Sequence, residues 1–252
     1  MKPAVIAHRG NSQDYRENTW AAFLAAQTAG ADAIECDIQS TVDGQLIVRH
    51  DLYIYGRRIS EISEREVRGL DPGIVRACEL IDWAQAEGIG LLIEMKDTMS
   101  VGRIEQQLVR SRTDGLVFGS FNGPNLLALR EKAGSLETSL MIGSVMGADE
   151  MAYLADRYQC GGVHPCWEHR DPYPHSLMVR ERVSALQDKG LKVTLWHEER
   201  EEQLEHLVAL APDAICTNDP ATLRRLVDRS HPSAQAPLDM DRPAGRTSGL
   251  PG

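Results

Sequence analysis

The chain has 252 residues, of which 42% are hydrophobic and 25% are charged. This length suffices for one large α/β domain or two small ones, and the composition is that of an ordinary globular protein. The net charge of −10 argues against nucleic acid and anionic membrane surfaces as partners. The five cysteines are scattered without a Cys-x-x-Cys pair, which indicates free thiols in a reducing compartment.

Targeting and membrane signals are weak in this sequence. The N-terminal run MKPAVIAHRG reaches charged residues too early for a secretory signal. Apolar runs stay well below the roughly 18 residues that a membrane-spanning helix needs. We therefore expect a cytoplasmic protein without integral membrane association.

Short apolar runs alternate with helical segments along most of the chain. Strands are predicted at residues 5–7, 34–38, 46–50, 91–95, 116–120, 140–143, 161–164, 191–196 and 214–217. Helices are predicted at residues 19–29, 79–87, 101–112, 124–132, 149–157, 177–189, 201–210 and 220–228. Such alternation predicts a parallel sheet with helical crossovers. Its length favours a closed TIM-type (β/α)8 barrel over an open doubly wound sheet.

Nine predicted strands are one more than such a barrel needs. Residues 40–45 are too few for a parallel crossover, so a hairpin should extend past the rim of the barrel and fold back over it. Residues 52–72 are polar and irregular, and they predict a short cap-like insertion. Residues 1–228 should form the barrel domain, and residues 229–252, rich in Pro, Gly, Ser and Arg, a disordered tail.

Two carboxylates lie on one face of the second predicted strand. Glu35 and Asp37 alternate with Ile34, Cys36 and Ile38, so both carboxylates point the same way. Adjacent carboxylates repel each other and are costly to bury unpaired, a cost that a bound cation removes. The alternative is a solvent-exposed hairpin with its polar residues outward, which does not explain the apolar flanks.

The Asp43-Gly44 pair is a strong signal for a two-residue hairpin turn. With that turn, Val42 pairs with Gln45, and His50 lies opposite Asp37. Cross-strand partners are about 5 Å apart at Cβ. The sequence therefore predicts an imidazole facing the carboxylate pair.

Polar residues follow several predicted strands at the end where barrel enzymes place their reacting groups. They are His8, Arg9, Glu35, Asp37, His50, Glu94 and Lys96. The three carboxylates are ligands that select Mg²⁺ or Ca²⁺. Arg and Lys suit a phosphate, and histidines suit acid–base chemistry. Together they predict metal-assisted cleavage of a small-molecule phosphodiester.

The motifs that carry these residues resemble those of the glycerophosphodiester phosphodiesterase family. The matching runs are HRG at 8–10, ENT at 17–19, GADAIECDIQSTVDGQLIVRHD at 30–51, GIGLLIEMKD at 88–97, SFN at 120–122, LKVTLW at 191–196 and DAICTNDP at 213–220. They span almost the whole predicted barrel in order. The resemblance implies a TIM-type barrel enzyme of lipid metabolism. It would hydrolyse glycerophosphodiesters to glycerol 3-phosphate and an alcohol, with one divalent cation.

The resemblance also assigns roles to individual residues. It implies metal ligands at Glu35, Asp37 and Glu94, an acid–base pair at His8 and His50, phosphate contacts from Arg9 and Lys96, and a substrate contact from Trp196. Which histidine is the acid stays open, as does the choice between water and a substrate hydroxyl as nucleophile.

The first part of the chain departs from the family pattern at two places, and the second of them alters the predicted cap. Arg16 stands where the family usually has Pro, and residues 52–56 (LYIYG) replace the usual run after the His-Asp pair. The unusual residues 52–72 and 160–175 motivate a second hypothesis, a lysophospholipase-D-like or specialised pathway enzyme that acts on a larger diester. A third is a catalytically silent binding barrel, although no rim residue is missing. A fourth is an unrelated metal-dependent barrel, such as an aldolase or isomerase, which would not explain the paired histidines.

Residues 160–175 read CGGVHPCWEHRDPYPH and combine two cysteines with three histidines. A zinc site is conceivable, but the spacing matches no standard finger. A rim loop that contacts the head group of the substrate is the favoured interpretation.

Overall fold

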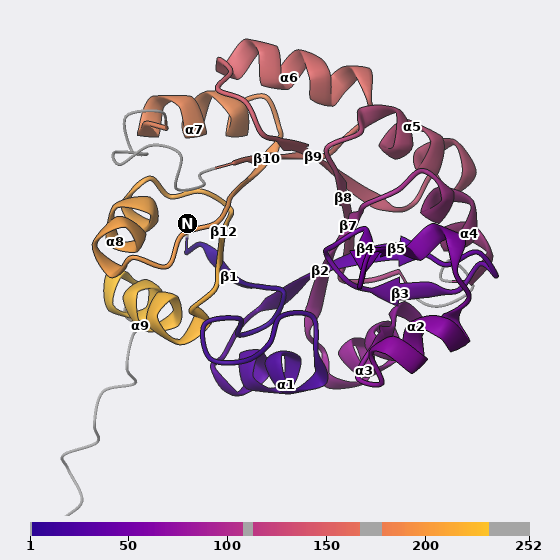
Figure 1. The fold of residues 1–252 in the computed structure, drawn as a ribbon. Coiled ribbons are helices and arrows are strands. Elements are labelled where there is room, and N and C mark those ends of the chain that lie inside the picture. The colour runs from indigo at the N-terminus through magenta and orange to yellow at the C-terminus, as the bar shows by residue number, and fades with distance from the viewer. Residues whose placement is uncertain (1, 108–112, 167–177, 232–252) are drawn as a thin grey trace, which may run out of the picture.

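Eight parallel strands form a closed barrel in the computed structural model, which describes residues 2–107, 113–166 and 178–231 (Figure 1). They are β1 (Ala4–His8), β2 (Ala33–Ser40), β7 (Gly90–Met95), β8 (Leu116–Ser120), β9 (Glu137–Ile142), β10 (Gly162–Pro165), β11 (Lys192–Leu195) and β12 (Ala214–Thr217). Strand β1 pairs in parallel with both β2 and β12, which closes the ring. The predicted TIM-type barrel is confirmed.

Helices surround the barrel and pack their apolar faces on it (Figure 1). They are α1 (Trp20–Thr28), α3 (Ala77–Glu87), α4 (Met99–Gln107), α5 (Gly123–Lys132), α6 (Ala148–Arg157), α7 (Arg180–Gln187), α8 (Glu201–Ala209) and α9 (Pro220–Ser230). Thr19 begins α1 by accepting a hydrogen bond from the backbone N–H of Ala22. Gly88 ends α3 in the left-handed conformation, with φ +69°. The main hydrophobic core therefore lies between the helices and the strands.

A smaller apolar cluster fills part of the barrel interior. Its buried members are Ile6, Leu92, Trp196, Ala214 and Cys216. Inward-facing positions further along the strands are polar, as at Glu35 and Asp37. The polar groups therefore gather at the carboxyl ends of the strands, as expected for an enzyme of this fold.

The ninth predicted strand is β3 (Leu46–Val48), which runs antiparallel to the end of β2. The pairs are Ser40 with Leu46 and Ile38 with Val48, one residue out of the predicted register. The hairpin loop has three residues instead of two, and it ends at Gly44 with φ +81°. A left-handed glycine after a tight turn is typical of three-residue hairpin loops. Arg49, and not His50, is therefore the residue opposite Asp37.

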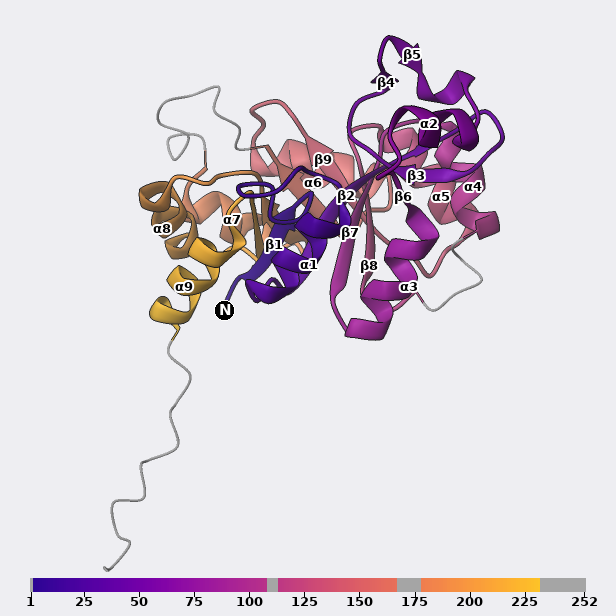
Figure 2. The same cartoon turned by 60° about the horizontal axis from the view of Figure 1, so that its bottom comes forward.

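Residues 52–76, here called the insertion, are more ordered than their sequence suggested. They contain β4 (Tyr53–Ile54), β5 (Arg57–Arg58), the 3₁₀ turn η1 (Ile59–Glu61), α2 (Glu64–Leu70) and β6 (Val75–Arg76). Figure 2 shows the insertion rising beyond the barrel rim, on the side of β2 and β3. Its isoleucines pack around Val67 and against Ile47 of β3.

A capping box explains why a helix forms in this polar stretch. Ser63 accepts a hydrogen bond from the N–H of Glu66, and the Glu66 carboxylate accepts one from the N–H of Ser63. The Asp43 side chain, in the hairpin loop, accepts a further bond from the N–H of Glu64 at 3.1 Å. The three-residue loop therefore also anchors the first turn of α2.

Parts of two predicted segments lie outside the described residues. Helix α9 continues through Ser230, two residues into the predicted tail, and residues 232–252 lie beyond the described part. Of the Cys/His-rich segment, residues 160–166 are described and 167–175 are not. In the described ranges, none of the helices combines the length and apolar character needed to cross a bilayer.

Candidate active site

Three carboxylates converge inside the carboxyl-terminal end of the barrel. Glu35 and Asp37 point inward from β2, and Glu94 comes from β7, where it pairs in register with Asp37. One oxygen from each of the three lies within 4.8 Å of the others. All three residues are at most 5% exposed. We call this group the carboxylate cluster; it is the only group of this kind found in the described residues.

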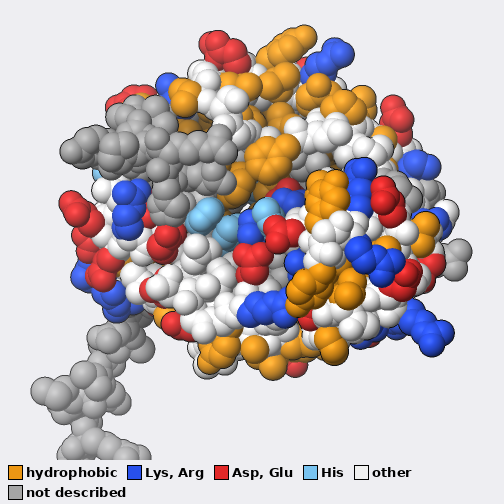
Figure 3. Space-filling view, viewed as in Figure 1, with side chains coloured by type: hydrophobic (Ala, Val, Ile, Leu, Met, Phe, Trp, Pro, Cys, Tyr) orange, Lys and Arg blue, Asp and Glu red, His pale blue; other side chains and the backbone are white. Residues whose placement is uncertain are grey.

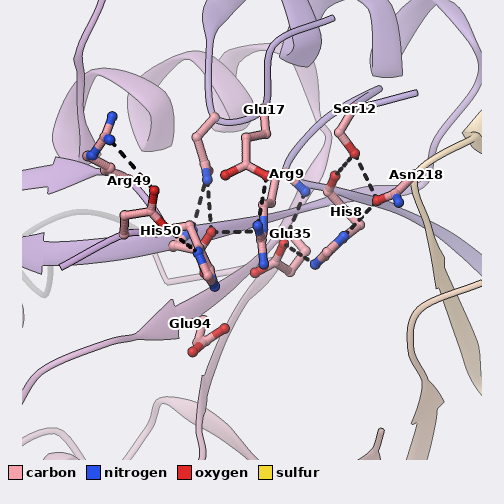
Figure 4. Close-up of polar contacts among 12 residues, drawn as sticks. His8, Arg9, Ser12, Glu17, Glu35, Arg49, His50, Glu94 and Asn218 are labelled. Carbon is pink, nitrogen blue, oxygen red and sulfur yellow. Dashed lines mark hydrogen bonds and ion pairs between the residues drawn. The ribbon is translucent and has the colours of Figure 1, made fainter. Parts of the chain in front are cut away.

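Two cations neutralise part of this negative charge. Arg9 Nε lies 3.2 Å from Asp37 Oδ2, and Lys96 Nζ lies 3.3 Å from Asp37 Oδ1. Lys96 also donates to Glu94 Oε1 at 2.7 Å. Arg9 has a second ion pair, 2.7 Å long, with Glu17 at the outer edge of the site. The two residues expected to bind phosphate therefore lie against the cluster, and Figure 4 shows Arg9 between Glu17 and Glu35.

Two residues of the loop that carries Arg9 have an unfavourable backbone conformation. Arg9 and Asn18 both adopt the left-handed conformation, with φ of +58° and +57°. Residues other than glycine disfavour this conformation by roughly 1–2 kcal/mol. Contacts with the cluster offset that cost, since Asn18 Nδ2 donates to Asp37 Oδ2 at 2.8 Å and Arg9 N donates to Glu35 Oε2 at 3.0 Å.

The three carboxyl groups differ in acidity. Burial raises the pKa of Glu94, and the nearby charge of Asp37 adds to this, giving a value of about 7. Burial and Asp37 likewise raise the pKa of Glu35 well above its usual range. Burial also opposes ionisation of Asp37, but Arg9 and Lys96 outweigh it and lower that pKa. Arg9 and Lys96 therefore stabilise the charge of Asp37 but do not fully compensate the charges of Glu35 and Glu94.

The donor set fits a hard divalent cation. All three side chains offer carboxylate oxygens, and Asp37 Oδ1 is a buried atom that accepts no hydrogen bond. Cys36 lies between the two acids of β2 but faces the main core, and burial raises the pKa of its thiol well above the usual value. The cluster thus presents oxygen without sulfur, as Mg²⁺ or Ca²⁺ requires.

His8 lies beside the cluster with its ring orientation fixed. Its Nδ1 is 2.7 Å from Asn218 Oδ1, which also accepts a hydrogen bond from Ser12 Oγ at 2.9 Å. An amide oxygen only accepts, so His8 Nδ1 carries the hydrogen and Nε2 holds a lone pair. Nε2 lies 3.9 Å from Glu35 Oε2, on the cluster side (Figure 4).

His8 is also held in its neutral form. Burial lowers its pKa well below the usual value, and the nearby His197 and Arg9 lower it further. The ring of His197 stacks on that of His8, with centroids 4.2 Å apart and planes 19° apart. A neutral ring with its lone pair toward the cluster can accept a proton at neutral pH.

His50 follows β3 and lies across the cluster from His8 (Figure 4). Its Nδ1 is 3.0 Å from Asp51 Oδ1, and its side chain is 35% exposed. His50 and Lys96 line one surface pocket together. The predicted pairing of His50 with Asp37 was wrong by one residue. The structure nevertheless brings His50 to the site, because the chain leaves β3 at Val48 and turns over the rim.

Gln39 fixes that turn. Its Nε2 donates to three successive carbonyl oxygens, those of Arg49 at 2.7 Å, His50 at 3.2 Å and Asp51 at 2.8 Å. Gln39 is 2% exposed and lies on the same face of β2 as Asp37. The backbone around His50 is thus bound to the strand that carries two cluster acids.

Trp196 lies in the barrel interior, 6% exposed, with its Nε1 donating to His164 O at 2.9 Å. Its ring centroid is 6.3 Å from that of His8 and 5.5 Å from that of Phe121. Phe121 is 47% exposed at the rim. Figure 3 shows histidine, acidic and basic side chains meeting at the centre of this face, with apolar side chains beside them.

Comparison with known proteins decides the family. A model of the glycerophosphoryl diester phosphodiesterase family matches residues 8–222, which include every residue of the site described above. The chain belongs to the glycerophosphoryl diester phosphodiesterase family. The resemblance found in the sequence is confirmed, and with it the prediction of an enzyme of this class.

Relatives of this phosphodiesterase family cover most of the chain. A glycerophosphodiester phosphodiesterase of Caldanaerobacter subterraneus is 29% identical over 249 residues, covering 90% of this chain and 98% of that protein. A phosphodiesterase of Oleispira antarctica, solved with the product sn-glycerol-3-phosphate, is 24% identical with a TM-score of 0.76. It matches 90% of this chain and 97% of its own. A putative glycerophosphoryl diester phosphodiesterase of Silicibacter pomeroyi is 22% identical with a TM-score of 0.79, at 90% and 94% coverage. These two structures share the barrel fold.

Three side chains that touch the predicted acid–base pair were not assigned from the sequence. They are Gln39, His197 and Asn218. Each carried a signal, because Gln39 continues the inward alternation of β2 and the other two come within two residues of the end of a barrel strand. Contact with a particular histidine depends on the fold, however, so the sequence offered no reason to choose them.

Proposed function

We propose that the protein hydrolyses glycerophosphodiesters to glycerol 3-phosphate and an alcohol, with one divalent cation, Mg²⁺ or Ca²⁺, held by Glu35, Asp37 and Glu94. The observation that carries this proposal is the buried carboxylate cluster between two histidines. Family membership supplies the substrate class. When bound there, the cation stabilises negative charge on the phosphoryl oxygens. A role in cytoplasmic lipid metabolism is part of the same proposal.

The state of His8 favours it as the general base. It is neutral, and Asn218 holds its Nδ1–H so that Nε2 faces the cluster. Nε2 would take the proton of the attacking hydroxyl group as the new P–O bond forms. Asn218 and Ser12 keep the ring in that tautomer, which is the tautomer a base at this position needs.

His50 is then the general acid. Asp51 would accept a hydrogen bond from Nδ1 and orient the ring, and in the acid role the second ring nitrogen would carry the proton that is given up. His50 would give its proton to the departing alkoxide as the old P–O bond breaks. Arg9 and Lys96 would donate hydrogen bonds to the phosphate, and Trp196 would contact the substrate beside His8.

Release of glycerol 3-phosphate from glycerophosphocholine tests this proposal. Asn at His8 or His50 should lower kcat by about 10²–10⁴ in the presence of Mg²⁺, the range for loss of a general acid or base. The replacement His206→Gln, on the exposed side of α8, is the matched control and should not lower kcat. Full activity in EDTA, or in the His8 variant, would contradict the mechanism.

A larger diester, as in a lysophospholipase-D-like or specialised pathway enzyme, is the second candidate. Exposed apolar side chains at the rim favour it: Leu52 is 39% exposed, Tyr53 54% and Phe121 47%. An acyl chain attached to the glycerol could lie on this surface. A higher kcat/KM for lysophosphatidylcholine than for glycerophosphocholine, lost in the variant Phe121→Ser, would select this candidate. If Phe121→Ser lowered kcat/KM equally for both substrates, this candidate would be excluded.

A further inference from the structure

A chain of ion pairs connects the insertion to His50. Asp71, at the end of α2, accepts two hydrogen bonds from the Arg16 guanidinium, one from Nη1 at 3.3 Å and a second from Nη2. Arg49 Nη1 lies 3.6 Å from Asp71 Oδ2, and Arg49 Nη2 lies 3.8 Å from Asp51 Oδ2. The other oxygen of Asp51 lies 3.0 Å from His50 Nδ1. Figure 4 shows Arg49 and His50 together at the edge of the site.

Burial makes Asp71 the fixed member of this chain. It is 8% exposed, whereas the side chains of Arg16 and Asp51 are 61% and 66% exposed. Burial opposes its ionisation, but the hydrogen bond from Arg16 and the charges of both arginines lower its pKa. The N–H of Gly73 donates to Asp71 Oδ1 at 3.2 Å. Asp71 is therefore a largely buried, hydrogen-bonded anion that attracts Arg49.

The backbone near His50 does not depend on Asp71. Gln39 binds the three carbonyl groups of residues 49–51, and the N–H of Arg49 donates to Asp37 O at 2.8 Å. Loss of the Asp71 charge would consequently free the Arg49 side chain without releasing the loop. Asp51 is the other carboxylate within reach of Arg49, and a bidentate arginine would compete with His50 for it.

We propose that Asp71 is a positioning residue for His50: by holding the Arg49 guanidinium, it leaves Asp51 to orient the imidazole for proton transfer to the leaving alkoxide. The inference rests on the proposed role of His50 as general acid. It also gives the insertion a part in catalysis. The charged groups around His50 are Arg16 and Glu17 of the first loop, Asp37 of β2, Arg49 and Asp51 beside it, Asp71 of the insertion and Lys96 after β7.

Substrates with different leaving groups test the role of Asp71. A choline or glycerol leaving group needs a proton, whereas 4-nitrophenolate departs without one. The isosteric variant Asp71→Asn should lower kcat about 10-fold or more for glycerophosphocholine, since small misplacements of a catalytic group are costly. It should change kcat less than about twofold for the 4-nitrophenyl diester of glycerol phosphate, because that reaction requires no acid. KM and Mg²⁺ affinity should stay the same for both substrates.

Three further variants make the test specific. Arg57→Gln breaks an exposed ion pair with Glu66 in the same insertion, and it should leave both rates unchanged. In the double variant Arg49→Met with Asp71→Asn the competitor of His50 is gone, so the rate on glycerophosphocholine should recover. His50→Asn should show the strongest dependence on the leaving group.

Two outcomes overturn the inference and can be told apart. Equal losses on both substrates in Asp71→Asn, or no recovery in the double variant, would show that Asp71 has a structural role alone. If His50→Asn slows both substrates equally, the assignment of His50 as the acid fails, and the role of Asp71 falls with it. Hydrolysis in the second case would still depend on the carboxylate cluster, which leaves the rest of the proposed function standing.

Discussion

Replacing Glu94 by glutamine removes one charge from the carboxylate cluster while keeping the shape of the side chain. Glu94 is 5% exposed, and its pKa is raised from 4.5 to about 7 by burial and by Asp37. The carboxylate is therefore destabilising in the metal-free protein, even though Lys96 donates to it. We expect Glu94→Gln to stabilise that form of the protein at alkaline pH and to weaken binding of the divalent cation.

The size of the effect follows from the pKa. The pKa of Glu94 is raised from 4.5 to about 7 in the folded protein. Because each pKa unit corresponds to about 1.4 kcal/mol, ionisation of Glu94 destabilises the folded protein by about 3 kcal/mol. The unfolded chain loses this proton near pH 4.5, and the folded protein keeps it up to about pH 7. Stability of the wild type should thus fall as pH rises between these values, and the cost should be fully present above the upper one.

Urea unfolding followed by circular dichroism measures this difference. In EDTA at pH 8, Glu94→Gln should be more stable than the wild type by up to about 3 kcal/mol, and the difference should disappear near pH 4.5. Millimolar Mg²⁺ should stabilise the wild type and have little effect on the variant. Glu131→Gln, on the exposed side of α5, is the control. A variant that is less stable than the wild type at pH 8 without metal would refute the electrostatic argument.

Other changes test the surroundings of the site. The Mg²⁺ affinity measured by calorimetry should fall about tenfold for each pH unit below 7, because Glu94 then takes up a proton that the metal must displace. Gln39→Leu should lower the free energy of unfolding by about 1–3 kcal/mol, because it leaves three backbone carbonyls without their donor. Gly10→Ala should cost more than about 2 kcal/mol, since φ is +85° and the new Cβ would lie 2.7 Å from backbone carbon of Ala22. At Gly56, with φ +76° and no atom within 4 Å of a Cβ, the same change should cost about 1 kcal/mol.

The sequence predicted the barrel because each strand and helix leaves a local signal. Apolar strands alternate with helical segments, and end residues such as Thr19 and Gly88 mark helix boundaries. The cluster was predictable for a similar reason. Alternation along β2 fixes the shared face of Glu35 and Asp37, and the parallel fold brings strand ends together. Local pattern and topology together were enough to gather these acids.

Hairpin register and side-chain pairing were less predictable. The Asp43-Gly44 pair is compatible with both two- and three-residue loops, and the contact of Asp43 with the N–H of Glu64 is a tertiary contact that the local sequence does not reveal. Because the loop is one residue longer than predicted, Arg49 lies opposite Asp37 in place of the predicted His50. The order of the insertion was missed because its isoleucines are spaced irregularly, and they form a core only after folding over β3.

The position of β3 has a consequence for protein engineering. Leu46 and Val48 belong to the main core, whereas Ile47 belongs to the core of the insertion, so one short strand forms a wall between two hydrophobic cores. Adding or deleting one residue in the loop at 42–44 would exchange these faces, and both cores would receive side chains of the wrong shape. Chimeras that swap insertions between relatives should accordingly keep residues 38–48 from the barrel parent and supply a matching partner for Ile47.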